Sequence, residues 1–284
     1  MLTSSRNRRP SLTNSSLTDG PSLTETRPLP SPTPPGIGTA STHLFLAIPN
    51  NCGSTLAARL ISQSEHVATL GAEGQHVPGF AGPIPRERGN ALLFTRQLDE
   101  LQDERFYDWP TIQELWNARW ERTPGALIRM EKSPPNIARI EMLRDNFPNA
   151  CFVISWRNPY AQVEGIMRGR RGTIGATTAA WHALSCLDLA RRALFIPVSQ
   201  TRMSYERICE NPNRLITQVS EMVRVQLPPI DPDAPIKIKG RLWNGIRSTN
   251  DEQIERLDPR DVRVISEIFK TRRDLFKYFD YEIL

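Results

Sequence analysis

Short apolar runs alternate with segments of helical periodicity along most of the chain. The run His43 to Ile48 predicts a buried strand, and Leu56, Leu60 and Ile61 then recur at the spacing of one helix face. The same succession repeats, with further strands predicted at Ala126 to Met130, at Ala150 to Ser155, and at Phe195 to Val198 extending toward Met203. Strands that alternate with helices indicate an α/β fold, with a parallel β-sheet flanked by helices on both faces.

Each predicted strand ends in a set of polar residues. The sets are Asn50 to Thr55, Glu131 to Pro134, Arg157 to Pro159 and Tyr205 to Arg207. Ligands of such sheets bind outside the carboxyl ends of the strands. We therefore expect the four sets to meet at one edge and to form a binding site.

The first of these sets is a turn of small residues between a strand and a helix. Free N–H groups and the helix dipole at such a turn suit a phosphate or a sulfate. The turn is P-loop-like, but Ser54 follows Gly53, where an ATP-type loop requires a lysine. A G-x-G-x-x-G pattern is also missing after the strand, so the sequence disfavours both an NTPase and a dinucleotide-binding fold.

Four motifs in order resemble those of sulfotransferases that use 3′-phosphoadenosine 5′-phosphosulfate (PAPS). Residues 51–56, Asn-Cys-Gly-Ser-Thr-Leu, resemble the [KR]-S-G-[ST]-T-L loop of that family. Lys132-Ser-Pro134 resembles the K-x-P turn of the tyrosylprotein and bacterial branch. Arg157-Asn-Pro159 resembles R-[DN]-P, and Tyr205-Glu-Arg-Ile208 with Pro212 resembles Y-E-D-L…P. The resemblance covers about residues 43–284 and implies the sulfotransferase fold.

The resemblance also implies which residues bind PAPS and its product 3′,5′-ADP, without a metal. Arg157 would bind the 3′-phosphate, Tyr205 would approach the adenine, and Arg247 with Ser248 would belong to a loop that closes over the nucleotide. The 5′-phosphosulfate would be held by the loop residues Asn50, Asn51, Cys52, Gly53, Ser54 and Thr55.

The catalytic roles come from the same resemblance. Lys132 would meet the oxygen that bridges phosphorus and sulfur, and Glu73 would be the general base, with His76 as the rival base. The chain would transfer a sulfuryl group to a hydroxyl or amine of a small-molecule, natural-product-like acceptor. The aromatic-rich insert Gly74 to Trp120 is expected to face that acceptor.

Two departures from the family pattern leave an alternative open. Asn51 stands where the family has Lys or Arg, and Gly165 stands where a serine is usual, so the chain could instead be a nucleotide-binding relative without catalysis. Cys52 at the helix start is either an activated thiol or an inert small residue. A nucleic-acid binder using Arg168, Arg170 and Arg171 is a third interpretation.

Composition separates the first 40 residues from the rest of the 284-residue chain. Residues 1–40 hold seven of the 24 prolines and fourteen Ser or Thr, which predicts a disordered tail, either a linker or an organelle-targeting segment, ahead of a domain over 41–284. The tail carries +2 of the net charge of +5, so the domain is too weakly basic to favour nucleic acid as a partner. The apolar runs are too short to span a membrane, and four scattered cysteines indicate a reducing, cytoplasmic compartment. No pattern indicates an oligomeric state.

Overall fold

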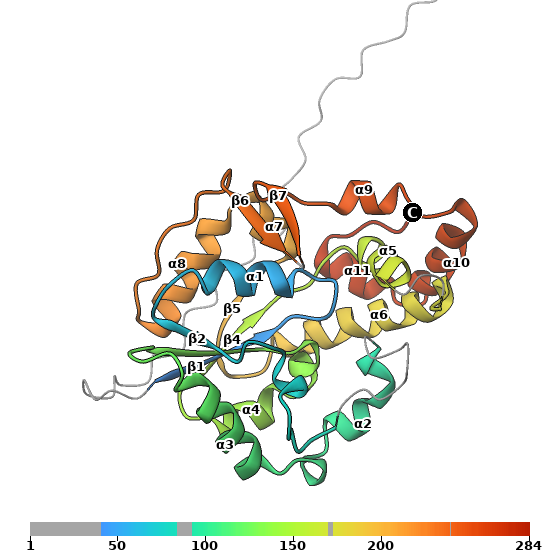
Figure 1. Ribbon diagram of the computed structural model, residues 1–284. Coiled ribbons are helices and arrows are strands. Elements are labelled where there is room, and N and C mark those ends of the chain that lie inside the picture. Colours follow the sequence, from blue (N-terminus) through green and yellow to red (C-terminus); the bar gives the residue numbers. More distant parts are fainter. Residues whose placement is uncertain (1–40, 84–92, 170–172, 239) are drawn as a thin grey trace, which may run out of the picture. The chain divides into compact units, whose positions relative to one another are not determined.

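A parallel β-sheet forms the centre of the structure, a computed structural model that describes residues 41–83, 93–169, 173–238 and 240–284. The described residues contribute five strands in the order β2-β3-β1-β4-β5 (Figure 1). Their bounds are β1 (Thr42–Ala47), β2 (Val67–Thr69), β3 (Ile128–Lys132), β4 (Ala150–Ile154) and β5 (Ser199–Arg202). Neighbouring strands all run parallel. The predicted α/β sheet is therefore confirmed, with β1 in the middle.

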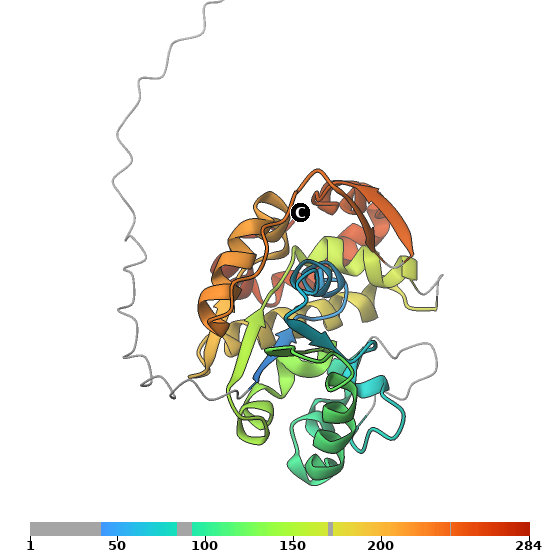
Figure 2. The ribbon, with the colours of Figure 1, turned by 60° about the vertical axis from the view of Figure 1, so that its left-hand side comes forward.

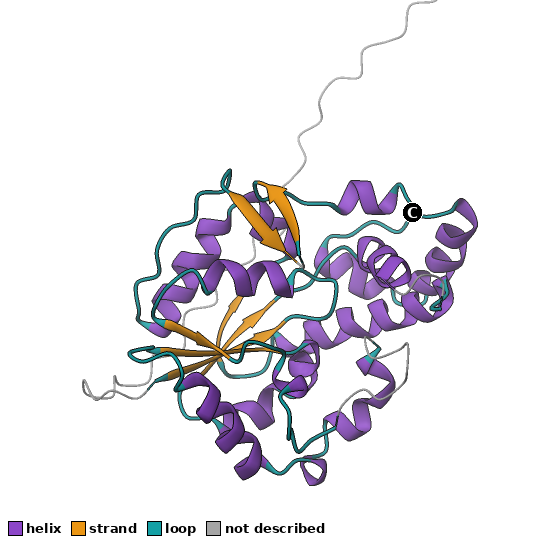
Figure 3. Ribbon diagram, viewed as in Figure 1, coloured by secondary structure: helices purple, strands orange, loops and turns teal. Residues whose placement is uncertain are grey.

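Helices cover both faces of this sheet (Figures 2 and 3). The α-helices are α1 (Ser54–Ile61), α2 (Leu98–Leu101), α3 (Trp109–Trp120), α4 (Ile140–Asn146), α5 (Pro159–Gly169), α6 (Ala176–Ala193), α7 (Tyr205–Glu210), α8 (Pro212–Val223), α9 (Asn250–Ile254), α10 (Pro259–Lys270) and α11 (Arg273–Phe279). Short 3-10 turns are η1 (Gly74–His76), η2 (Phe94–Gln97), η3 (Glu104–Phe106) and η4 (Pro134–Ala138).

Alternation along the strands divides the core into two clusters. Phe45 of β1 packs with helices α3 to α6, α10 and α11 on one face, whereas Leu44 and Leu46 pack with α1, α7 and α8 on the other. Since successive strand side chains point to opposite faces, one continuous apolar run can fill both clusters. This explains why the apolar runs located β1 and β4 correctly.

The sequence prediction was wrong in detail at three strands. Glu131 and Lys132 are the last residues of β3, not part of a turn, because they stay in register with Phe45 and Leu46 of β1. The edge strand β5 is the polar segment Ser199–Arg202, which lies in the predicted extension toward Met203, but the apolar run from Phe195, where the strand was predicted to begin, lies between α6 and β5. The three-residue strand β2 was not predicted.

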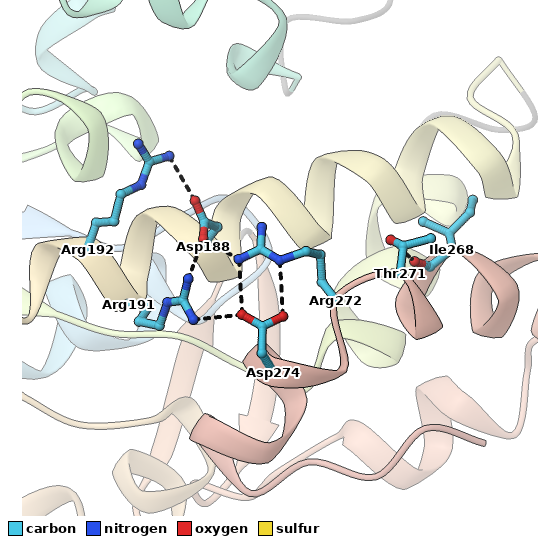
Figure 4. Close-up of polar contacts among 7 residues, drawn as sticks. All are labelled: Asp188, Arg191, Arg192, Ile268, Thr271, Arg272 and Asp274. Atoms are coloured by element: carbon cyan, nitrogen blue, oxygen red, sulfur yellow. Dashed lines mark hydrogen bonds and ion pairs between the residues drawn. The ribbon is translucent and has the colours of Figure 1, made fainter.

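An ion-pair network joins the end of α6 to α11 (Figure 4). Asp188 contacts Arg191, Arg192 and Arg272 at 3.2, 3.0 and 2.9 Å. Asp274 contacts Arg191 at 2.8 Å and Arg272 at 3.1 Å. These pairs fix the last helix against the long helix α6, on the side of the fold that also carries α10.

A small antiparallel hairpin lies apart from the main sheet. It consists of β6 (Pro235–Ile238) and β7 (Arg241–Asn244), and α1 lies between it and the sheet in both ribbon views (Figures 1 and 2). Ile236 packs into the apolar cluster that α1 also joins. The hairpin thereby forms a wall beside the first turn of α1.

The remaining expectations concern the N-terminal tail and membrane-spanning helices. The predicted tail, residues 1–40, lies outside the described residues. Within the described ranges, no helix is both long enough and apolar enough to cross a bilayer.

Candidate active site

The loop after β1 has the backbone that an anion-binding turn requires. Gly53 caps α1 with φ +89°, and Asn51 lies in the left-handed region with φ +59°. A Cβ at Gly53 would lie 2.6 Å from Cδ2 of Tyr205, so both conformation and space require glycine there. Since the first N–H groups of a helix have no acceptor within the helix, those of Ser54 and Thr55 remain available to a ligand.

Arg157 follows β4 and lies buried beside this loop, with 6% of its surface exposed. Its guanidinium donates to Asn51 O at 3.0 Å, and to Oδ1 of Asn250 at 2.7 Å. It also donates to Thr249 Oγ1 at 3.0 Å and to Gln253 Oε1 at 2.5 Å. All four acceptors are neutral, and no carboxylate of the described residues forms an ion pair with it.

No carboxylate of the described residues contacts the guanidinium directly: Glu206 lies behind Asn250, and Glu164 lies behind Gln253. Burying a cation without an anionic partner is unfavourable, because neutral dipoles replace only part of the lost hydration. Arg157 also lies over the ring of Tyr205, 4.1 Å from its centroid, which adds a cation–π contact. The electrostatics at this point of the structure therefore favour an incoming anion.

A cavity of about 170 Å³ opens at these residues. The predicted residues that line it are Asn51, Gly53, Ser54, Thr55, Arg157, Tyr205 and Arg247. The other lining residues were not among the predicted cofactor-binding residues. They are Leu56, Arg168, Ile236, Ile238, Trp243, Gly245, Ile246, Thr249 and Gln253. The polar residues after β1, β4 and β5 thus meet at one edge, as expected. The opposite, apolar wall comes from the β6–β7 hairpin, whose strands of four residues each are too short to be recognised in the sequence.

Three predicted binding residues lie outside this lining. Ser248 accepts the N–H of Asn250 at 3.3 Å. Cys52 is 1% exposed, its N–H donates to Pro49 O, and burial raises the pKa of its thiol, so the interpretation as an activated thiol is wrong and the inert one holds.

Asn50, the third of them, is oriented by a buried histidine. Its Oδ1 lies 2.8 Å from Nε2 of His182, whose Nδ1 lies 2.7 Å from Oγ1 of Thr95. Burial lowers the pKa of His182 to about 3, which keeps the ring neutral. With Oδ1 engaged, the Nδ2 amide of Asn50 is buried without a partner, and so is Nδ2 of Asn51. Of these two unpartnered amides, only that of Asn51 belongs to a residue that lines the cavity, where it could donate to an anion.

Two of the three predicted catalytic residues, Glu73 and Lys132, line a second cavity of about 400 Å³. Lys132 Nζ lies 3.2 Å from Oε1 of Glu73, and both side chains line this cavity with Thr55, which also lines the first. His76 Nδ1 is 3.6 Å from Oε2 of Glu73, but its side chain is half-exposed and does not line the cavity. The geometry thus places Glu73 and Lys132 next to the anion-binding turn.

A buried network behind Glu73 was not predicted. Glu131, 1% exposed, accepts the Gly74 N–H at 2.8 Å and a bond from the Ser133 hydroxyl on Oε1. Its Oε2 accepts from Nδ2 of Asn136, whose own Oδ1 is held by Arg139 at 2.9 and 3.1 Å. In the sequence, the only sign of this network is the polarity of residues 131–134. Through its bond to the Gly74 N–H, Glu131 fixes the peptide group that follows Glu73.

The aromatic insert does not face the second cavity. Phe94, Trp116 and Trp120 are fully buried in the core, Tyr107 and Trp109 nearly so, and no aromatic ring of the described residues lines the cavity that holds Glu73. The expectation that this insert faces the acceptor is therefore not supported for these side chains. Trp116 of α3 packs against Phe45 and Phe147, which holds this helix and its aromatic side chains against one face of the sheet.

The two departures from the family pattern are neighbours in space. A Cβ at Gly165 of α5 would lie 3.3 Å from Cγ of Asn51 and 3.1 Å from Nε2 of Gln253. The space for a side chain at position 165 is therefore filled by Asn51 and Gln253. Asparagine also suits the left-handed backbone at position 51, which longer side chains adopt less readily.

The remaining candidates give no second site. Arg168 forms an ion pair with Glu164 at 2.8 Å, and the other two arginines of the nucleic-acid interpretation lie outside the described residues. Among the side chains that the structure describes, no group of three or more His, Cys, Asp or Glu is arranged to hold a metal ion. All four cysteines are free and buried.

Comparisons with known proteins agree with this geometry. The sulfotransferase domain from the curacin biosynthetic pathway shares the fold, with a TM-score of 0.54 at 15% identity over 86% of this chain and 99% of that one. A sulfotransferase from Alicyclobacillus acidocaldarius gives a TM-score of 0.50 at 15% identity, over 86% of this chain and 97% of that one. No curated protein sequence matches significantly. The model of the sulfotransferase family, however, matches residues 50–229, and the chain belongs to that family.

Proposed function

We propose that the protein binds PAPS and transfers its sulfuryl group to a hydroxyl or amine of a small-molecule acceptor. The observation that carries this proposal is the buried guanidinium of Arg157, which has only neutral partners and lines the cavity beside the first turn of α1. A ligand with a phosphate at Arg157 gives the guanidinium a direct anionic partner, which the neutral acceptors do not supply.

The residues present fit the whole donor. The free N–H groups at the start of α1 and the unpartnered amide of Asn51, which lines the cavity, suit the phosphosulfate. The apolar wall with Trp243 suits a purine ring. Arg247, on the rim, is ion-paired with Glu252 at 3.1 Å and adds positive charge to the segment that precedes α9.

Bound PAPS supplies a sulfuryl group with 3′,5′-ADP as leaving group. Glu73 takes the proton from the acceptor oxygen or nitrogen as that atom bonds to sulfur and the bridging S–O bond breaks. Lys132 stabilises the negative charge that develops on the bridging oxygen. Because Glu73 and Lys132 contact each other, an acceptor at Glu73 is also close to the lysine.

The donor site is tested by calorimetric titration with 3′,5′-ADP. The wild type should bind, Arg157→Ala should weaken binding by roughly tenfold or more, and the matched control Arg214→Ala, on the exposed face of α8, should not. The donor assignment would be refuted if the wild type did not bind 3′,5′-ADP, or if Arg157→Ala bound it as tightly as the wild type.

Catalysis is tested separately, by transfer of ³⁵S from labelled PAPS to a panel of alcohols, phenols and amines. Transfer that stops in Glu73→Gln, while 3′,5′-ADP still binds, supports the proposed chemistry. Nucleotide binding without transfer to any acceptor would instead identify the chain as a relative without catalysis, the alternative that Asn51 and Gly165 had raised.

A further inference from the structure

The second cavity carries more positive than negative charge on its walls. Glu73 and Lys132 face it from the turn after β2 and from the end of β3, and Arg59 of α1 and Lys237 of β6 face it from two other elements. The other residues that line it are Thr55, Ala58, Ser62, Thr69, Leu70, Gly71, Ala72, Met130 and Gly240.

The charges on these walls are not balanced. Glu73 and Lys132 neutralise each other through their 3.2 Å ion pair. Arg59 donates its Nε to the main-chain oxygen of Lys237 at 3.4 Å, and neither of these two side chains forms an ion pair with a carboxylate of the described residues. Two positive charges thus remain, held near each other by the contact between α1 and β6.

Local structure explains why both cations face this cavity. Thr55, Arg59 and Ser62 follow one face of α1 at helical spacing. Along β6 the side chains alternate. Ile236 and Ile238 therefore line the first cavity, beside Arg157, while Lys237 lines the second one. One strand therefore presents an apolar surface to one cavity and a positive charge to the other.

The rest of the lining is aliphatic or small. Leu70, Ala72, Met130 and Ala58 supply the apolar surface, and none of the described residues places an aromatic ring there. An aromatic acceptor would thus find no ring to stack on among the described lining residues, whereas a short aliphatic chain matches their apolar side chains.

We infer that the acceptor is an aliphatic alcohol that also carries an anionic group, a carboxylate or a phosphate, which binds between Arg59 and Lys237 while its hydroxyl lies at Glu73. This inference rests on the proposed function and adds the substrate class. Two partly exposed charge contacts of this kind correspond to a roughly three- to thirtyfold preference for the anionic over the matched neutral alcohol.

The test measures binding to the protein saturated with 3′,5′-ADP, by calorimetry at low salt. The probes are two matched pairs, 3-hydroxybutyrate against 1,3-butanediol and glycerol 3-phosphate against glycerol. The variants are Arg59→Gln with Lys237→Gln, and a control, Arg263→Gln with Lys277→Gln, whose exposed cations lie on α10 and α11. Thermal unfolding checks that each variant is folded.

We expect at least one anionic probe to bind more tightly than its neutral partner. This preference should be largely lost in Arg59→Gln/Lys237→Gln and retained in the control. The pair with the larger preference identifies the anion as carboxylate or phosphate. Equal binding within both pairs, no binding of either anion at millimolar concentration, or an unchanged preference in the double variant would overturn the inference. Nucleotide binding is measured first, so that its absence refutes the proposed function, whereas its presence without an anion preference refutes this inference alone.

Discussion

Replacing Glu131 by glutamine tests whether the buried network behind Glu73 stabilises the fold and positions Glu73, the base in the proposed function. Both carboxyl oxygens accept from groups that can only donate: the Gly74 N–H on Oε1, and Nδ2 of Asn136 on Oε2. The orientation of Asn136 is fixed because its Oδ1 accepts from Arg139. An amide at position 131 offers one oxygen and one NH₂ group, so one of the two donors must face another donor.

The size of the effect follows from this mismatch. A buried polar group that loses its partner costs about 1–3 kcal/mol. For a domain of this size, 1 kcal/mol shifts the melting temperature by roughly 2–4 °C, so a loss of about 2 kcal/mol lowers it by roughly 4–8 °C. Because Gly74 directly follows Glu73, the base should also shift, and kcat should fall by about ten- to a hundredfold with little change in KM.

Urea unfolding followed by tryptophan fluorescence measures the stability of this variant. Trp116, one of six tryptophans, donates its Nε1 to Gly74 O at 3.3 Å and packs where a Cβ at Gly74 would collide, so the emission of the protein includes a probe beside this turn. Glu141→Gln, on the exposed side of α4, is the matched control and should unfold like the wild type. An unfolding midpoint of Glu131→Gln equal to that of the control, with unchanged kcat, would refute the reasoning.

Three further predictions concern single side chains. Glu73→Gln should abolish sulfuryl transfer while His76→Gln reduces it only slightly, because His76 lies beside the cavity and not in it; the reverse order in kcat would make His76 the base. Cys52 should resist iodoacetamide at pH 7.5 in the native protein and react only in urea, since burial raises the pKa of its thiol; mass spectrometry of the labelled peptide decides this. The hydrogen bond from Arg272 lowers the pKa of Asp274 to about 2, below its unfolded value near 3.9, so the stability that this carboxylate contributes is present above pH 4 and is lost as pH falls toward 2. Asp274→Asn should therefore lower the melting temperature at pH 7, by no more than the ~1 kcal/mol of a half-exposed pair, and thermal scans should show the difference vanishing near pH 2.

The sequence could predict the centre of the fold because its strands are buried on both faces. Continuous apolar runs such as those of β1 and β4 are the pattern of such strands, and the polar residues that follow them identified the loop after β1, Lys132 and Arg157. Edge strands lack this pattern. For that reason β2 went undetected, and β5 was predicted to begin at Phe195 instead of Ser199.

The far walls of both cavities could not be predicted for a different reason. Trp243 and Lys237 reach the site from a hairpin whose strands have four residues each, too short for a periodic pattern to distinguish them from a loop. Glu131 was assigned to a turn, because a charged residue after an apolar run usually marks the end of a strand. Its burial depends on donors from Gly74 and Asn136, which no local pattern reveals.

The position of the positive charge at the anion-binding turn also follows from packing. Asn51 carries no charge of its own, but its main-chain oxygen accepts from Arg157, and its side chain fills the space beside Gly165. The positive charge beside the turn therefore comes from the end of β4, through Arg157. A lysine at position 51 would have to adopt the same left-handed backbone against Gly165, and would bring a second cation close to a buried guanidinium without a counter-ion. Neutral Asn51 is thus the residue that this arrangement of Arg157 favours, and its replacement of a basic residue is not by itself a sign that the site has lost its affinity for anions.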